Sequence, residues 1–215
     1  MKDLLYKEFR LVINPLFFLV LLFSALLLIP QWVYFVAMLY FLFIAVPNIF
    51  ANAKAVNDIS FTVMLPIRKR DVVKVRVLSI TVLELLQIAL AAVFVTINMA
   101  LYPNGNFMID ANIAYLGCVF VMYGIFNAIF FPMFYRSAYK IGWPILIAVT
   151  ASMLFAAAIE TLVLSIPAAA HILDGISGDA LLRQLPVMAI GIVFFVLLTM
   201  LAYKKSAKNF ERVDL

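Results

Sequence analysis

Ser177 and His171 are the two residues of this chain whose types could carry out nucleophilic catalysis. Ser177 lies in the sequence GISG (175–178), and His171, the only histidine, precedes it by six residues. An intramembrane serine protease needs its nucleophile and its base on different helices, within hydrogen-bond reach, whereas these two share one short segment. A zinc protease needs several ligands, and the chain has no H-E-x-x-H sequence. We therefore predict no catalytic residues and no metal site.

Acidic and amide side chains inside apolar stretches are the second group that could act chemically. Glu84, Gln87 and Asn98 recur at roughly helical spacing in one stretch, and Glu160 lies in another. A charge at membrane depth is costly, so such residues turn away from lipid. Two interpretations remain open: the four side chains line a substrate pathway or subunit seam, or they hydrogen-bond within a helical bundle.

The elements that must position these residues follow from composition. The chain is 67% hydrophobic and 13% charged, with a mean hydropathy of +1.13, whereas about a quarter of residues are charged in soluble domains. About 20 apolar residues in a helix cross the hydrocarbon core. We predict an all-α, polytopic membrane protein with six transmembrane helices, at 13–30, 32–51, 77–101, 112–135, 143–166 and 187–203.

Two further segments complete a single predicted transmembrane domain, 1–215. Residues 1–12 place apolar and charged side chains on opposite helix faces, which is typical of an amphipathic helix in the interface. The segment 165–186 has two apolar pieces separated by Gly175 and Gly178. It predicts two short external re-entrant helices between spans five and six.

The positive charges are distributed very unevenly over the predicted loops. An even number of spans puts both termini on one side, and that side receives all 16 Lys and Arg residues except Arg183. The positive-inside rule then places both termini in the cytoplasm, with the chain in a bacterial cell membrane. The net charge of +5 is explained by this rule and requires no nucleic acid.

The cytoplasmic loop 52–76 holds more charge than topology needs. Its first part predicts a short helix that Pro66 ends, and Asp71 suits the first turn of the next span. Two interpretations compete for the basic residues. The loop could lie on anionic lipid, or it could bind a cytoplasmic partner.

The sequence of this loop, Asn57-Asp58 followed by LPIRKRDVVKVR (65–76), resembles the first cytoplasmic loop of short ABC-2-type permeases. Three other segments resemble that family in the same order: LLYKEFRL (4–11), FFPMFYRSAYKIGW (130–143) and the ending KKSAKNFERVDL (204–215). The family's usual Glu before the loop helix is replaced here by Asn57-Asp58. Within the family, the chain resembles exporters of amphipathic peptides, including those for phenol-soluble modulins and lantibiotics.

This resemblance implies a permease subunit that works with two copies of a separate cytoplasmic ATPase and with a second permease, identical or a sister chain. ATP and Mg²⁺ would bind the ATPase. The chain itself has no G-x-x-x-x-G-K-[ST] phosphate loop, so we predict no cofactor bound by it and no enzyme activity. The resemblance also implies a coupling helix in the loop. The residues predicted to couple to the ATPase are Asn57, Asp58, Ile59, Ser60, Val63, Leu65, Pro66, Arg68, Lys69, Arg70 and Asp71. The alternative function is an ATPase-independent secondary transporter or a membrane assembly factor.

Overall fold

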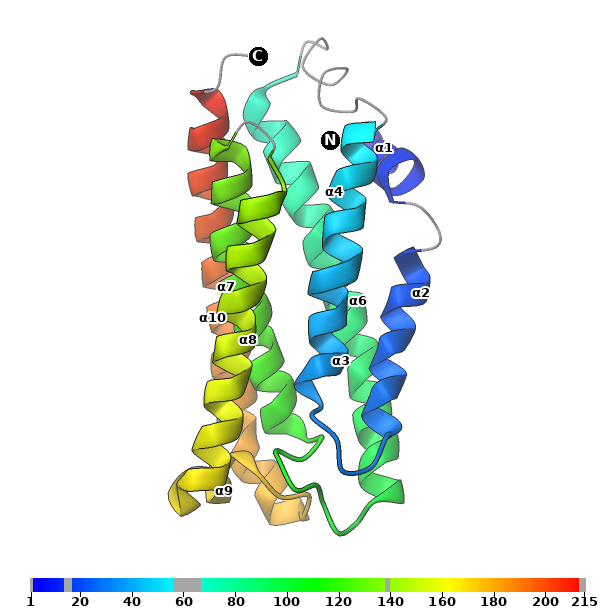
Figure 1. Cartoon of the computed structure of the whole chain (residues 1–215), viewed down its shortest axis with the longest axis vertical. Coiled ribbons are helices and arrows are strands. Elements are labelled where there is room, and N and C mark those ends of the chain that lie inside the picture. Colours follow the sequence, from blue (N-terminus) through cyan, green and yellow to red (C-terminus); the bar gives the residue numbers. More distant parts are fainter. Residues whose placement is uncertain (1, 14–16, 56–66, 138–139, 213–215) are drawn as a thin grey trace.

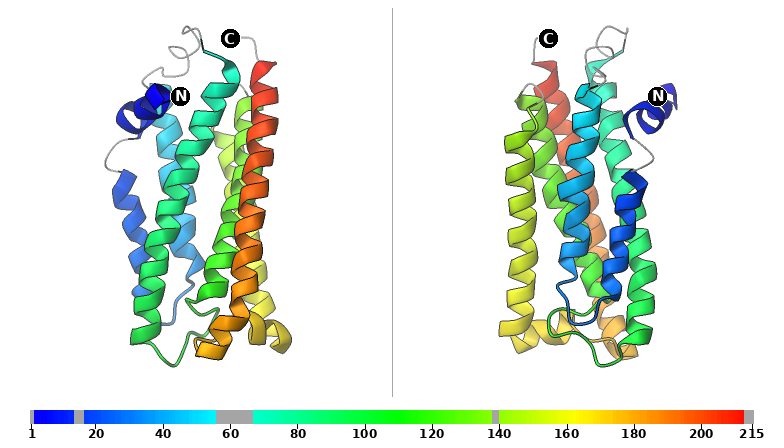
Figure 2. Two further views of the ribbon diagram at one scale, coloured as in Figure 1. Left: turned by 180° about the vertical axis from the view of Figure 1, so that it is seen from behind. Right: turned by 45° about the vertical axis from the view of Figure 1, so that its right-hand side comes forward.

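The computed structural model describes residues 2–13, 17–55, 67–137 and 140–212, and the regular secondary structure in this part of the chain is all helical, without a strand. The long helices run side by side in one elongated bundle, and both termini lie at the same end (Figures 1 and 2). The predicted all-α class is confirmed. The predicted single domain agrees with this bundle and stays a prediction.

Five helical stretches within the described residues are long and apolar enough to cross a membrane. The first is continuous through α3 (Phe35–Tyr40), a π-helical turn η3 (Phe41–Ala45) and α4 (Val46–Ala55). The others are α6 (Lys69–Leu101), α7 (Ile113–Arg136), α8 (Gly142–Ser165) and α10 (Gly178–Glu211). At 1.5 Å per residue, α6 and α10 are about 50 Å long, compared with about 30 Å for the hydrocarbon core. Both therefore continue beyond the predicted spans 77–101 and 187–203.

The first predicted span, 13–30, is helical over a shorter range than expected. The helix consists of α2 (Phe17–Leu21) and a 3₁₀ stretch η2 (Leu22–Leu28), and the backbone is extended at Ile29. Residues 14–16 lie outside the described residues. The 3₁₀ stretch packs against α6, where the Ser24 hydroxyl accepts a hydrogen bond from the Gln87 side chain. Local contacts with α6 thus accompany the change from α-helical geometry.

The ends of the bundle carry the shorter elements. At the end with the termini lie α1 (Lys2–Lys7) and a π-helical segment η1 (Glu8–Val12), which occupy the predicted N-terminal helix. At the other end lies α9 (Pro167–Leu173). The second expected external helix is not separate: its residues form the first turns of α10, because Ser177 caps that helix and Pro186 is accommodated within it.

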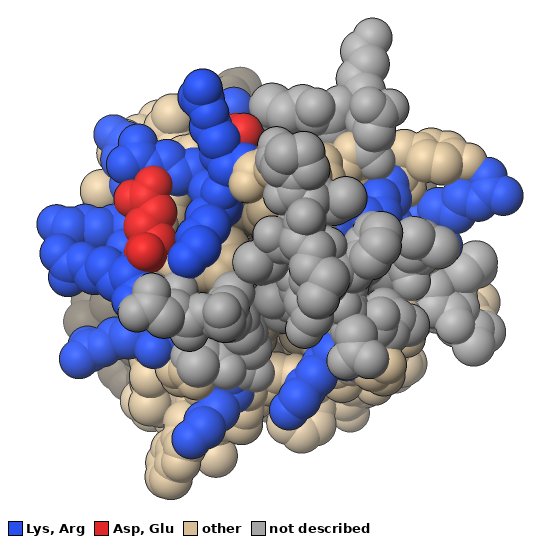
Figure 3. Space-filling model, turned by 90° about the horizontal axis from the view of Figure 1, so that it is seen from above, with Lys and Arg blue, Asp and Glu red and all other residues tan. Residues whose placement is uncertain are grey.

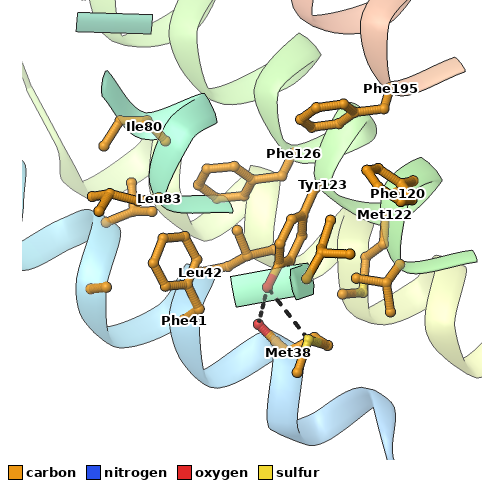
Figure 4. Close-up of a cluster of buried hydrophobic side chains, with 14 of the residues drawn as sticks. Met38, Phe41, Leu42, Ile80, Leu83, Phe120, Met122, Tyr123, Phe126 and Phe195 are labelled. Carbon is orange, nitrogen blue, oxygen red and sulfur yellow. Dashed lines mark hydrogen bonds between the residues drawn. The ribbon is translucent and has the colours of Figure 1, made fainter. Parts of the chain in front are cut away.

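Aromatic side chains fill the space between the α3–α4 helix and α7. The Phe50 ring lies edge-on to Phe130 and Phe134, with ring centroids 4.9 and 4.6 Å apart, a favourable geometry for aromatic pairs. Deeper in the bundle, the Tyr123 hydroxyl donates to the Met38 carbonyl at 3.2 Å (Figure 4). These aromatic residues belong to one continuous hydrophobic core, in which α7 is the most buried of the long helices.

Helices α7 and α10 approach each other most closely at two glycines. A Cβ atom at Gly117 would lie 2.8 Å from the Val187 carbonyl oxygen, and one at Gly191 would lie 2.8 Å from the Gly117 carbonyl carbon. One turn further along α7, Phe120 meets Phe195 of α10 edge-on at 5.6 Å. These contacts fix how the polar residues of the two helices face α6.

Candidate functional site

Glu84 is buried at the junction of three long helices. Its side chain on α6 is fully buried, and its Oε2 accepts a hydrogen bond from Asn127 Nδ2 of α7 at 2.8 Å. The same amide group lies 3.2 Å from Thr199 Oγ1 of α10. Within the described residues, Glu84 Oε1 and Asn127 Oδ1 accept no hydrogen bond. A protonated carboxyl would supply a donor here and avoid placing a charge at membrane depth.

Gln87 and Asn98 face the first helical hairpin instead. Gln87 Nε2 donates to Ser24 Oγ of η2 at 2.8 Å. Asn98 Nδ2 donates to the Leu27 carbonyl at 2.6 Å and to the Tyr34 hydroxyl at 2.9 Å. Both side chains are buried. The polar side chains of α6 thus bond to neighbouring helices in two directions, Glu84 to α7 and the other two to the first hairpin. A role for them in lining a pathway or subunit seam stays a prediction.

Glu160 lies near the opposite end of the bundle, far along the chain from the α6 group. Its Oε2 accepts a hydrogen bond from the Ile109 backbone N–H at 3.1 Å, and the residue is 6% exposed. This bond ties α8 to the loop between α6 and α7. Glu160 is thus separate from Glu84 and packs at the end of the bundle opposite the termini. A role beside a pathway stays a prediction.

Two aspartates hold the same loop against the α9–α10 junction. Asp110 accepts hydrogen bonds from the backbone N–H groups of Asn106 and Gly175, at 2.6 and 3.0 Å, and its own N–H donates to Asp174. Burial and the adjacent charge of Asp174 raise the pKa of Asp110 to about 6, although the two backbone donors lower it. Asp110 therefore holds a proton more readily than a solvated aspartate, which reduces repulsion between the two carboxyl groups.

The nominal serine–histidine pair is used structurally. Ser177 Oγ accepts a hydrogen bond from the Ala180 N–H and caps α10, which is the usual role of serine at this position. His171 Nε2 lies 2.6 Å from Arg183 Nη1. Among the described residues there is also no cluster of three or more His, Cys, Asp or Glu side chains that could hold a metal.

The predicted ATPase-coupling residues divide into two groups. Seven of them lie outside the described residues: Asn57, Asp58, Ile59, Ser60, Val63, Leu65 and Pro66. The other four stand at the start of α6, where Arg68 is exposed and takes the N-cap position, and Asp71 lies in the first turn as expected.

The basic residues at the start of α6 face different surroundings. Lys69 Nζ lies 5.6 Å from the centre of the Phe210 ring, and Arg70 forms an ion pair with Glu211 of α10. The Arg76 side chain points inward and is 4% exposed, and its Nε lies 2.8 Å from Glu8 Oε2. Figure 3 shows Lys and Arg side chains gathered over this end of the bundle. Arg76 is therefore unavailable to a cytoplasmic partner, while Arg68 lies on the surface.

An apolar groove of about 500 Å³ opens between the α3–α4 helix and α8. Phe43, Leu146 and Met153 are more than half exposed around it. The residues that line it are Phe43, Pro47, Gly142, Ile145, Leu146, Val149, Thr150 and Met153. The groove can accept an apolar chain or the face of another helix.

The comparison with protein families matches almost the whole chain. Residues 3–211 match the family described as ABC-2 family transporter protein. The chain belongs to this family. No curated protein and no solved structure matches it.

Membership in the ABC-2 family makes this chain the membrane component of a transporter. It is a multi-pass protein of a permease family that lacks an ATPase domain and generally works with separate ATPase subunits. The predicted family resemblance is confirmed at this level. The peptide-exporting branch is a finer prediction and is treated below.

Several residues that hold the site together were not singled out in the sequence analysis. Thr199 and Ser24 are the partners that place Asn127 and Gln87, and Glu8 holds Arg76. A polar residue in the middle of an apolar span is a signal that could have found Thr199 and Ser24. Nothing in the sequence distinguishes Glu8 in this way, because it is one of several charged residues in the predicted interfacial helix.

Replacing Glu84 separates its packing role from a pathway role. We expect Glu84→Gln to fold like the wild type, because an amide oxygen can still accept the bond from Asn127. Glu84→Leu removes that acceptor, and leaving a buried donor unsatisfied costs about 1–3 kcal/mol. Thermal unfolding in detergent measures this difference. If the Glu84→Gln variant has normal stability but reduced transport, Glu84 has a role in the pathway. If its transport is unchanged, the role of Glu84 is packing.

Proposed function

We propose that this chain is the permease subunit of an ATP-driven exporter that moves amphipathic or antimicrobial peptides out of the cell. The observation that carries the proposal is the family match over residues 3–211, which covers every long helix. In this proposal two ATPase copies dock on the permease and bind ATP and Mg²⁺. A second permease, identical or a sister chain, completes the transporter. The peptide substrate rests on the sequence resemblance to that branch of the family.

The proposed topology has six spans with both termini in the cytoplasm. The five long apolar helices and the shorter apolar helix Phe18–Leu28 support this count. The gathering of Lys and Arg at the end that holds the termini supports the orientation, because cytoplasmic loops are enriched in these residues. The ATPase would therefore bind the end of the bundle shown in Figure 3.

The proposed pathway runs beside the apolar groove between the α3–α4 helix and α8. A second permease packed on this side would enclose the groove between two chains, and the exposed Phe43, Leu146 and Met153 would face it. An apolar lining suits the apolar face of an amphipathic peptide. Met153 is also flexible and adapts to varied shapes.

The proposed coupling element is the loop that joins α4 to α6. The support is its position, since it connects two candidate spans at the basic end, together with the sequence pattern in which Ile59 and Val63 stand four residues apart. Residues four apart share one face of a helix. That face would insert into the ATPase, and Arg68 would lie beside the contact and tune association.

Introducing an acid on the apolar face of the loop tests the proposal. We expect Ile59→Asp and Val63→Asp to insert normally, since no positive charge is lost, but to release the ATPase or let it hydrolyse ATP without transport. The measurements are ATPase co-purification and ATP hydrolysis alongside peptide export. Ile172→Asp, which places the same change on exposed α9 at the opposite end, is the matched control. Normal export in both loop variants would contradict the coupling role.

An ATPase-independent carrier or an assembly factor is the alternative function. Family membership favours the ATPase-driven transporter, since permeases of this family generally work with ATPase subunits. Purification of the chain from native membranes tests the choice. An ATPase that co-purifies in stoichiometric amount supports the exporter, and export that persists after ATP depletion supports the carrier.

A further inference from the structure

A basic groove separates the cytoplasmic ends of α6 and α10. Its volume is about 460 Å³, and Tyr203, Lys204, Lys208 and Arg212 line it on the α10 side, with Arg70 on the α6 side. Helices α6 and α10 contact each other and lie side by side at the end of the bundle that holds the termini (Figure 2). The groove is therefore a feature of two packed helices and does not depend on the loop 56–66.

The electrostatic balance of the groove is positive. Among the described residues that line the groove, Glu211 is the one acid, and it pairs with Arg70, whose Nη2 donates to Glu211 Oε2 at 3.1 Å. Lys204, Lys208 and Arg212 are exposed, and among the described residues none of them forms an ion pair with an acid. Three cations around one cavity attract an anion, and a phosphate offers enough oxygens to accept from all of them.

Apolar surface continues directly from this groove toward the membrane. On α10, Leu197 and Leu201 are half exposed and precede Lys204 and Lys208 on the same helix face, at intervals of three and four residues. On α6, Leu78 follows Lys74 and Arg70 at intervals of four. Helix α10 thus presents cations at the end of an exposed apolar strip, and α6 carries an exposed leucine one turn beyond Lys74. A ligand with an anionic head and an apolar tail matches this order.

We propose that the groove between α6 and α10 binds the phosphate headgroup of an anionic phospholipid, whose acyl chains lie along Leu197, Leu201 and Leu78. A soluble ATPase could reach the cations but not the apolar strip within the membrane, which favours lipid over a protein partner. The inference concerns lipid binding and does not depend on what the chain transports.

Native mass spectrometry of the purified full chain with added phosphatidylglycerol tests this site. We expect phosphatidylglycerol to bind more tightly than phosphatidylcholine. Lys204→Gln/Lys208→Gln should weaken phosphatidylglycerol binding on the order of tenfold or more, since each basic side chain near anionic lipid contributes about fivefold. Lys54→Gln/Lys205→Gln, which removes equal charge at the same end outside the groove, should bind as the wild type does.

Two further measurements keep the result interpretable. Lys204→Arg/Lys208→Arg should retain binding, and an unchanged melting temperature in the glutamine variant excludes misfolding. Excess inorganic phosphate should fail to displace the lipid. Displacement by phosphate, with no preference between the two lipids, would overturn the proposal in favour of a free-phosphate site. Unchanged lipid binding with lost ATPase binding in the glutamine variant would overturn it in favour of a protein contact.

Discussion

Gly191→Ala is expected to be among the most damaging single substitutions in the bundle. The new Cβ would lie 2.8 Å from the Gly117 carbonyl carbon and 2.9 Å from its Cα, and closer still to the carbonyl oxygen. All three atoms belong to the backbone of α7, so no side chain can rotate away. Overpacking of a tight interior usually costs about 1–3 kcal/mol, and more where the backbone must shift.

The separation of α7 and α10 would disturb more than local packing. Asn127 of α7 lies between Glu84 of α6 and Thr199 of α10, and both hydrogen bonds depend on the present spacing. We therefore expect the apparent Tm in detergent to fall by about 5–10 °C, together with a loss of transport.

Gly178→Ala is the matched control in the same helix. A Cβ at Gly178 meets no atom within 4 Å, and alanine favours helix more than glycine does by about 1 kcal/mol. The control should therefore melt at the wild-type temperature or slightly above. An unchanged Tm for Gly191→Ala would show that α7 and α10 can separate freely, and that the close approach is not needed for stability.

The helical class, the polar residues within α6 and the gathering of basic residues at one end were predictable from sequence because each depends on a local pattern. Uninterrupted apolar runs identify α7 and α8 almost to the residue, and Asn98 follows Gln87 at a whole number of helical turns. These signals need no knowledge of which helices touch.

Helix ends and long-range partners were less predictable. Hydropathy marks where apolar residues stop, so it missed the charged continuation of α6 from Lys69 and of α10 to Glu211. It also gave no sign that Leu22–Leu28 adopts 3₁₀ geometry. The coupling residues 57–66 lie outside the described residues, so their helix stays a prediction.

The pair formed by Glu8 and Arg76 illustrates why charge patterns mislead. From sequence, Arg76 belongs to a basic loop and Glu8 to a surface helix, 68 residues apart. In the fold both side chains are 4% exposed, and Arg76 Nη2 donates to Glu8 Oε1 at 3.0 Å. The guanidinium also lies 5.4 Å from the centre of the Phe50 ring. One arginine thereby joins the N-terminal segment, α4 and α6 at the base of the proposed coupling loop.

We expect Arg76→Met to destabilise this junction strongly, because it removes the guanidinium that pairs with the buried Glu8 carboxylate. Removing one partner of a buried ion pair costs about 3–5 kcal/mol, whereas replacing both by apolar residues is often neutral. The double variant Glu8→Leu/Arg76→Met should therefore be more stable than Arg76→Met alone. Arg76→Lys should fall between, since lysine keeps the charge but not the two-pronged geometry.

The rate of trypsin cleavage after Lys7 and Arg10 reports on this junction. A protease can bind this backbone only after η1 has detached from α6. Arg76→Met should be cleaved faster than the wild type, and the double variant should regain protection. Arg68→Met removes the same charge from an exposed position and should leave cleavage unchanged. If the double variant is cleaved as fast as Arg76→Met, then Arg76 holds the segment through contacts other than Glu8, and the ring of Phe50 becomes the partner to test. If the double variant is protected from trypsin but no longer exports, the ion pair is needed to couple motion of the N-terminal segment to motion of α6. Apolar packing alone then cannot replace it.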